Sequence, residues 1–222
     1  MREPREPVRV AVNVMRARLT VVGFNLAIIT YQLNAIPRLP GAVPLPELGI
    51  SVHLATDITL LLGLALSIMA MVSFIVSVSF DEQGTCNHWS LLAGDLLMYL
   101  GMAQSVAGFF RPFMGVLDAI EPRALGPPEA FVAVHAAAVI GGGAAWLAAT
   151  YVGPVVALLR SPFGRPATLA LALAYLVLLV AIAQVGVQAT RFEVAHRDGD
   201  AAAVPLLGEF LQPCLLYTSR CV

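Results

Sequence analysis

Two acidic residues stand inside long apolar runs of this chain and are the first groups that could carry chemistry. Asp57 lies in the run 50–80 and Asp95 lies in the run 89–110. A carboxylate inside a lipid-embedded helix is costly, so it usually faces a partner or an aqueous path for protons or ions. Asp95 is the stronger candidate, because only fifteen residues separate it from Arg111 and so few do not cross a bilayer.

His88 precedes Asp95 by seven residues and therefore shares its helix face. The spacing predicts an intramembrane charge site at which the two groups take up protons. The structural alternative is an ion pair between Asp95 and either Arg16 or Arg18, which would hold two helices together. Asp57 also has a structural alternative, as the first-turn anion of its helix at the opposite interface.

Two histidines, His53 and His135, stand near the starts of two runs that should cross the membrane in the same direction. Two histidines at one depth could ligate the iron of a b-type haem axially, and in this the pair resembles the haem site of transmembrane b-type cytochromes. The alternative places both histidines at the membrane interface without a ligand. Haem b is the one cofactor for which the sequence offers candidate ligands.

Polar amides collect on the same side of the membrane as the two histidines. Side-chain amides in spans either line a polar cavity or join helices through hydrogen bonds worth about 0.6–2 kcal/mol each. The candidates for such a cavity are Gln32, Gln104, Gln184 and Gln188.

Small residues recur at a spacing that lets helices pack closely. Residues 54–67 read LATDITLLLGLALS and residues 92–105 read LAGDLLMYLGMAQS, so both carry Asp, then Gly, then Ser. Small residues four apart lie on one helix face and allow close approach. The packing residues predicted in this way are Gly63, Ser67, Gly101, Ser105 and, from a fainter copy, Gly141. Such copies are typical of inverted-repeat transporters, although chance in an Ala- and Leu-rich chain explains them equally well.

The elements that must position these groups are long hydrophobic helices. Of 222 residues, 59% are hydrophobic and 12% are charged, and the mean hydropathy is +0.82. A soluble domain has about 25% charged residues, so half of the usual surface charge is missing. We predict an all-α, polytopic transmembrane bundle of about five spans, at 19–36, 50–80, 89–110, 131–159 and 167–190. A polar segment (1–18), a Pro-rich loop (38–49), a connector (111–130) and an unassigned tail (192–213) complete the chain.

The last nine residues, Cys214–Val222, resemble the translation of a sequencing adapter. Such artefacts are excluded from fold reasoning. We therefore expect the native chain to continue past Pro213 and the fold to be truncated at its C-terminal end. Cys86 is then the one native cysteine, which provides no disulfide framework.

Charge and motifs narrow the class of protein. A net charge of −1 argues against a nucleic-acid partner, which leaves the lipid bilayer and a further copy or subunit in the membrane. All thirteen basic residues are Arg, so a Schiff-base lysine is excluded, and a usage rich in Ala and free of Lys is typical of bacteria with GC-rich genomes. Seven arginines on the N-terminal side against five on the other favour a cytoplasmic N-terminus in the plasma (inner) membrane.

Three functional hypotheses follow, of which the first is ion- or proton-linked transport, or a membrane subunit of such a system. The second is haem-based electron transfer, and the third is a non-catalytic scaffold whose polar groups all serve packing. The sequence carries no phosphate-binding Gly loop, nucleophile elbow, HExxH or paired CxxC, so a soluble-type hydrolase or kinase is excluded and an enzyme is not expected.

Overall fold

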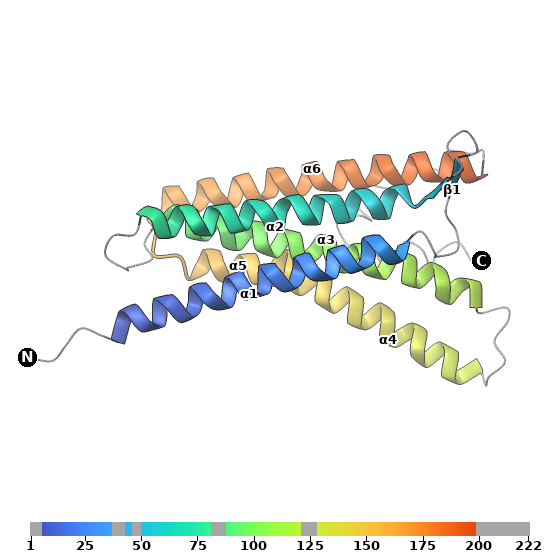
Figure 1. Cartoon of the computed structure of the whole chain (residues 1–222), viewed down its shortest axis with the longest axis horizontal. Helices are drawn as coiled ribbons and strands as arrows, with labels where there is room; N and C mark the ends of the chain where they lie inside the picture. Colours follow the sequence, from blue (N-terminus) through green and yellow to red (C-terminus); the bar gives the residue numbers. More distant parts are fainter. Residues whose placement is uncertain (1–5, 37–42, 46–49, 81–87, 121–127, 199–222) are drawn as a thin grey trace, which may run out of the picture.

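The computed structural model describes residues 6–36, 43–45, 50–80, 88–120 and 128–198 (Figure 1). The suspected adapter residues and the connector 81–87 lie outside them. The described helices are α1 (Glu6–Ala35), α2 (Leu54–Phe80), α3 (Trp89–Ile120), α4 (Pro128–Leu147), α5 (Gly153–Leu159) and α6 (Arg165–Asp198), with a π-helical turn, η3 (Ala148–Val152), between α4 and α5. Five of the helical stretches are long and apolar enough to cross a membrane, which confirms the predicted all-α class.

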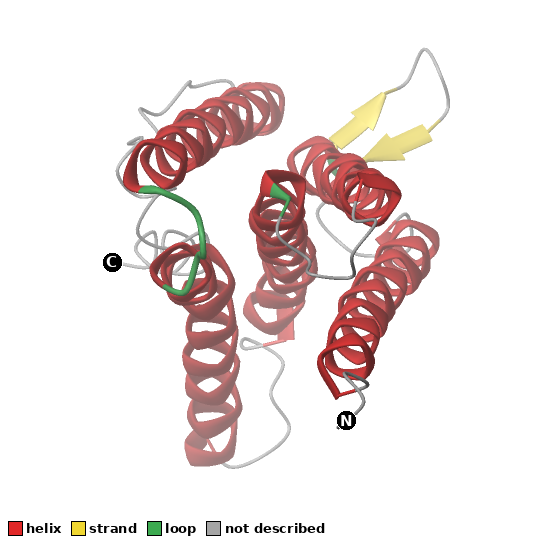
Figure 2. Cartoon of the chain, turned by 90° about the vertical axis from the view of Figure 1, so that its left-hand side faces the viewer, coloured by secondary structure: helices red, strands yellow, loops and turns green. Residues whose placement is uncertain are grey.

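Helix α3 is the centre of the bundle. It packs most extensively against α2 and also contacts α1, α4, η3, α5 and α6. Its candidate span is 67% buried, whereas no other candidate span is more than 33% buried. The view in Figure 2 shows the other long helices arranged around it. Side chains on α3 therefore face protein on nearly every side, and polar groups there must find protein partners.

Helix α1 contacts the bundle along one stripe, which we call the α1 seam. Its apolar members are seven residues apart, and so are its polar members, so both sets keep to one face over two-turn repeats. The buried apolar members are Met15, Val22, Ile29 and Ile36, and the polar members between them are Arg18, Asn25 and Gln32. The seam thus presents a polar group to α2 and α3 at regular intervals.

Helices α2 and α3 approach each other at two facing glycines. A Cβ atom built on Gly101 would lie 2.8 Å from Ser67 Oγ and 3.3 Å from the Gly63 carbonyl oxygen. A Cβ on Gly63 would lie 3.2 Å from Cβ of Gln104. The absence of side chains at both positions therefore permits the contact. The fourth span differs from the prediction, because Gly141 has open space around it, whereas the neighbouring Gly142 lies against the Phe110 ring.

The third span does not end where the sequence predicts. We expected a break at Arg111, but α3 continues through Pro112 to Ile120. A proline costs an interior helix one hydrogen bond, yet membrane helices tolerate it where neighbours support the turn. Here Phe109 and Phe113 stack across the proline at a centroid distance of 5.9 Å. Beyond the proline, Met114 is buried in the bundle.

The fourth span is interrupted by η3, which begins five residues before Gly153. The Gly153 N–H donates to the Ala148 carbonyl, the longer i to i−5 bond of a π-helical turn. Pro154 lacks an N–H and cannot serve the Thr150 carbonyl four residues earlier. That carbonyl instead accepts a 2.5 Å hydrogen bond from the Tyr175 hydroxyl of α6. The hydroxyl thus replaces the bond that the proline removes.

Replacing Tyr175 by phenylalanine is expected to lower the free energy of unfolding by about 0.6–1.7 kcal/mol, the range for interhelical hydrogen bonds in membranes. In a Pro154→Ala background, the restored N–H can serve the Thr150 carbonyl, so most of the loss should disappear. Denaturant unfolding of the four proteins in micelles gives the coupling energy. Equal losses in both backgrounds would show that the two groups do not share this carbonyl.

The remaining differences concern element ends. The expected loop 38–49 contains a strand, β1 (Val43–Leu45), which pairs antiparallel with β2 (Ile50–Val52), a segment predicted to be helical. The prolines that precede Ile50 in the sequence suit a short hairpin better than an extra helical turn. At the two ends of the chain, α1 begins at Glu6 within the expected polar segment 1–18, and α6 extends past Arg191 to Asp198.

Candidate functional site

An ion pair joins α1 to α3 near one end of the bundle. Arg18 Nε donates to Asp95 Oδ1 at 2.6 Å, and Arg18 Nη2 donates to Asp95 Oδ2 at 2.7 Å. This two-bond geometry is the strongest arrangement of guanidinium with carboxylate. The guanidinium carbon also lies 6.0 Å from the centroid of the Phe74 ring on α2. Of the two arginines considered in the structural alternative, Arg18 is therefore the partner of Asp95.

The length of α3 changes the expected depth of Asp95. The candidate span is Trp89–Leu117, with Asp95 six residues from one end and Arg111 six residues from the other. Twenty-nine residues extend about 44 Å, which exceeds a hydrocarbon core of about 30 Å. If the span is centred, both charges lie about 3 Å inside the core. The longer helix therefore removes the argument that Asp95 must lie well inside the membrane because Arg111 ends the span.

A second polar contact, between Asn25 of α1 and Ser67 of α2, lies further along the bundle. Asn25 Nδ2 donates to Ser67 Oγ at 2.8 Å, and Ser67 Oγ donates to the Gly63 carbonyl at 2.8 Å. Asn25 and Ser67 are both buried. Ser67 Oγ is also the atom nearest to a Cβ placed on Gly101, so the polar link and the close packing of α2 and α3 occupy the same place.

A small cavity with polar walls follows. It has a volume of about 30 Å³, which is space for about one water molecule. Thr59, Gln104 and Arg111 contribute its polar side chains. Its other walls are apolar residues of α2, α3 and α6 and Trp146 of α4. Arg111 Nη1 donates to Thr59 Oγ1 at 3.3 Å, and Thr59 Oγ1 donates to the Ala55 carbonyl at 2.7 Å. The Arg111 side chain, which we expected at the membrane interface, is thus half-buried inside the bundle.

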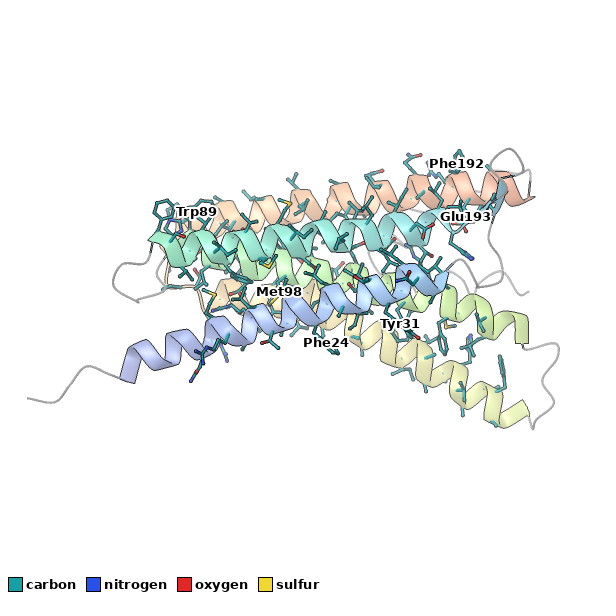
Figure 3. All side chains as sticks on the ribbon, in the orientation of Figure 1. Phe24, Tyr31, Trp89, Met98, Phe192 and Glu193 are labelled. Carbon is teal, nitrogen blue, oxygen red and sulfur yellow. The ribbon has the colours of Figure 1, made fainter. Side chains whose placement is uncertain are left out.

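The far end of the bundle gathers groups around the start of α2. Glu193 of α6, labelled in Figure 3, accepts a 3.1 Å hydrogen bond from the Ala55 N–H. A carboxylate at this position suits the positive end of the helix dipole. Asp57 is half-buried in the first turn, and its N–H donates to the carbonyl of buried His53 at 2.8 Å. Both carboxylates therefore lie where the dipole favours an anion.

His88 directly precedes α3 and contacts the first turn of that helix. Its Nδ1 lies 2.7 Å from Ser90 Oγ and accepts the Ser90 N–H at 3.3 Å. The ring also stacks on Phe80, at a centroid distance of 5.4 Å. The contacts described for His88 are those of a helix cap, whereas those described for Asp95 lead to Arg18. Seven residues of helix place the two about 10 Å apart along the axis.

The two histidines proposed as haem ligands belong to two helices that do not pack against each other. His53 lies at the start of α2, and His135 lies on α4 next to the Phe131 ring. Both helices pack on α3, and the contacts between α2 and α4 in the described parts are too few to form an interface. Figure 1 shows α4 diverging from the bundle below α3, away from α2. Within the described segments, no group of three His, Cys, Asp or Glu residues could hold a metal ion.

The four glutamines do not share one cavity. Gln104 lines the cavity beside Arg111, whereas Gln32 lines a separate groove between α1 and α3. Gln184 and Gln188 lie on the exposed face of α6. One turn of helix separates them, so they share a face, but that face points away from the bundle.

Several polar groups of this arrangement were not singled out from the sequence. They are Asn25, Thr59, Tyr175 and Glu193. The seven-residue spacing from Arg18 to Asn25 to Gln32 is the signal that could have found the first of them. Thr59 and Glu193 carry no comparable signal, because the groups that donate to them, Arg111 and the Ala55 N–H, belong to other helices.

Together the helices and the buried polar groups define a class, a multi-pass α-helical membrane protein. Comparison of the chain with family models, with curated proteins and with solved structures gives no match.

Proposed function

We propose that this protein carries protons across the membrane, alone or as a subunit of an ion-linked transport system. The supporting observation is a succession of buried polar groups beside α3, from one end of the bundle to the other. It starts at the Arg18–Asp95 pair, continues through Asn25 and Ser67, and ends at the Arg111 cavity and the Glu193 end of α2. Chains of such groups inside membranes are typical of proton relays.

The tight packing favours protons over larger cargo. The cavity in this succession holds about 30 Å³, which is too little for an organic solute or a hydrated ion. Along α3, the levels of residues 95, 101, 104 and 111 are about 9, 5 and 10 Å apart. A proton can cross such gaps through transient water, whereas a solute would require the helices to separate. Asp95 is the group that accepts the proton, and Arg18 holds the Asp95 carboxylate in position.

Proton flux into proteoliposomes tests this proposal. The Arg18→Gln/Asp95→Asn double variant removes both charges and retains two side chains that can hydrogen-bond, so the bundle should still fold. We expect its flux, driven by a membrane potential and followed with a trapped pH dye, to fall at least about tenfold. Gln184→Leu, on the exposed face of α6, is the matched control and should keep the wild-type flux.

An unchanged flux in a folded double variant would reject the proton route. A second function would then be favoured, a membrane scaffold in which the same groups only join helices. The two-bond geometry of the ion pair and the close approach of α2 to α3 both favour that alternative. In a scaffold, the double variant would change helix stability without changing flux.

The orientation that we propose places the N-terminus in the cytoplasm. Two of the twelve arginines assigned to the two sides, Arg18 and Arg111, point into the bundle, so they do not act as interfacial charges. The count then changes from seven against five to six against four, and its sign is unchanged. A cysteine introduced at the N-terminus tests this orientation by thiol labelling in right-side-out and inverted vesicles. We expect labelling of that cysteine in the inverted vesicles only.

A further inference from the structure

A long apolar groove lies between α1 and α3, on the side of the bundle where α1 and α4 spread apart (Figure 1). Its volume is about 840 Å³, and among its walls are Phe24 and Tyr31 of α1 and Met102 and Val106 of α3. Phe24 and Tyr31 are 67% and 73% exposed, and Figure 3 shows both on the lower edge of α1. In a membrane this groove opens sideways to lipid.

One polar side chain in this groove lacks a partner. Gln32 is only 5% exposed, both its amide atoms are covered by protein, and neither has a hydrogen-bond partner among the described residues. Of the polar members of the α1 seam, Arg18 pairs with Asp95 and Asn25 pairs with Ser67. A buried amide without a partner is unfavourable and usually has an explanation, such as a ligand.

The depth of Gln32 indicates which ligand group would reach it. The α1 span is Asn13–Ala35, twenty-three residues or about 35 Å, so each end extends about 2 Å beyond a 30 Å core. Gln32 lies three residues, about 5 Å, before the end of the span. It therefore sits just inside the hydrocarbon edge, next to the level of phospholipid ester carbonyls.

The length of the groove also matches a lipid chain. It follows α1 from Thr20 to Gln32, twelve residues or about 18 Å. One leaflet contributes about 15 Å of hydrocarbon. An acyl chain whose ester carbonyl accepts from Gln32 Nε2 would thus extend along the groove to about the middle of the membrane.

We propose that the groove holds one phospholipid of the leaflet at the Ala35 end of α1, with its acyl chain between α1 and α3, and that the Gln32 side chain turns into the groove so that its amide binds the ester carbonyl. This site does not depend on the proposed proton route, because Gln32 lines the groove and not the cavity beside Arg111. It would complete the α1 seam, in which each polar member then has a partner.

Native mass spectrometry of the full chain tests the site. The protein is released from bilayers of palmitoyl-oleoyl-phosphatidylglycerol, or of the diether analogue that has the same head group and chain lengths but no ester carbonyls. We expect the wild type to retain one diester lipid about 3- to 18-fold better than the diether, the ratio given by one intramembrane hydrogen bond. Gln32→Leu should remove this preference, and it should fold well because it removes an unpaired polar group.

Matched variants distinguish binding of the acyl chain in the groove from the contact of the ester carbonyl with the Gln32 amide. Val106→Trp fills the groove and should reduce retention of both lipids, whereas Val177→Trp, on the exposed face of α6, should not. Gln184→Leu should keep the diester preference of the wild type. Equal retention of diester and diether by the wild type would overturn the proposal. So would a groove-dependent dimer, seen as a doubled mass that Val106→Trp abolishes, because a second copy would then be the occupant.

Discussion

Arg18→Leu is expected to lower the free energy of unfolding by about 3 kcal/mol. The change leaves the Asp95 carboxylate without its two-bond partner in a place where Asp95 is only 8% exposed. Breaking a buried ion pair on one side costs about 3–5 kcal/mol, because the remaining charge stays desolvated. We expect the lower end of this range, since the Arg18 side chain keeps 22% of its surface exposed.

The control for this variant is Arg16→Leu, because Arg16 is exposed on the same helix. It should change stability by less than about 0.5 kcal/mol. Adding Asp95→Asn to Arg18→Leu removes the stranded charge and should recover most of the loss, although the double variant leaves an unpaired amide. Unfolding of the four proteins in micelles provides the comparison. Equal effects of Arg16→Leu and Arg18→Leu would contradict the ion pair as the stabilising contact.

Gly101→Val is expected to destabilise the bundle by about 3 kcal/mol, the upper end of the cost of overpacking a tight core. Its first side-chain carbon alone would lie 2.8 Å from Ser67 Oγ. Because Ser67 is hydrogen-bonded to Asn25 and to the Gly63 carbonyl, it cannot move without breaking both bonds. The substitution should therefore separate α2 from α3 and also disturb the contact with α1.

Gly141→Val provides the matched comparison for this prediction. Both glycines lie inside membrane helices, but among the described residues no atom lies within 4 Å of a Cβ added to Gly141. Its substitution should be neutral or slightly stabilising, because valine is a better helix former than glycine. Thermal unfolding of the two variants in one detergent isolates the packing effect. Similar melting temperatures for both would mean that the close approach at Gly101 does not limit stability.

Hydrophobic length and small-residue spacing made the helices predictable from the sequence. Five apolar runs of sufficient length predicted five spans, because lipid requires every backbone polar group to be paired within a helix. Because only a few residues connect the second predicted span to the third, the two helices must be antiparallel neighbours, and α2 is indeed the main packing partner of α3. The Arg18–Asp95 pair was one of two alternatives, because α1 and α3 begin on the same side of the membrane.

Features that depend on tertiary support were not predictable in this way. Pro112 and Arg111 favour a helix end when considered locally, but the Phe109–Phe113 stack within α3 and the Thr59 hydroxyl of α2 support a continued helix. The position of the break in the fourth span depends on Tyr175, which is provided by another helix. The pairing of histidines assumed that parallel helices are adjacent, whereas α3 separates α2 from α4.

The distance along the chain between the two members of the ion pair has a consequence for biogenesis. Arg18 and Asp95 are 77 positions apart, and ribosomes add about 5–20 residues per second. The first hydrophobic segment therefore leaves the ribosome about 4–15 s before the carboxylate that neutralises its guanidinium has been made. During that interval the nascent segment must keep its cationic end near water or lipid head groups, and it can adopt its final insertion only after the third segment has been synthesised.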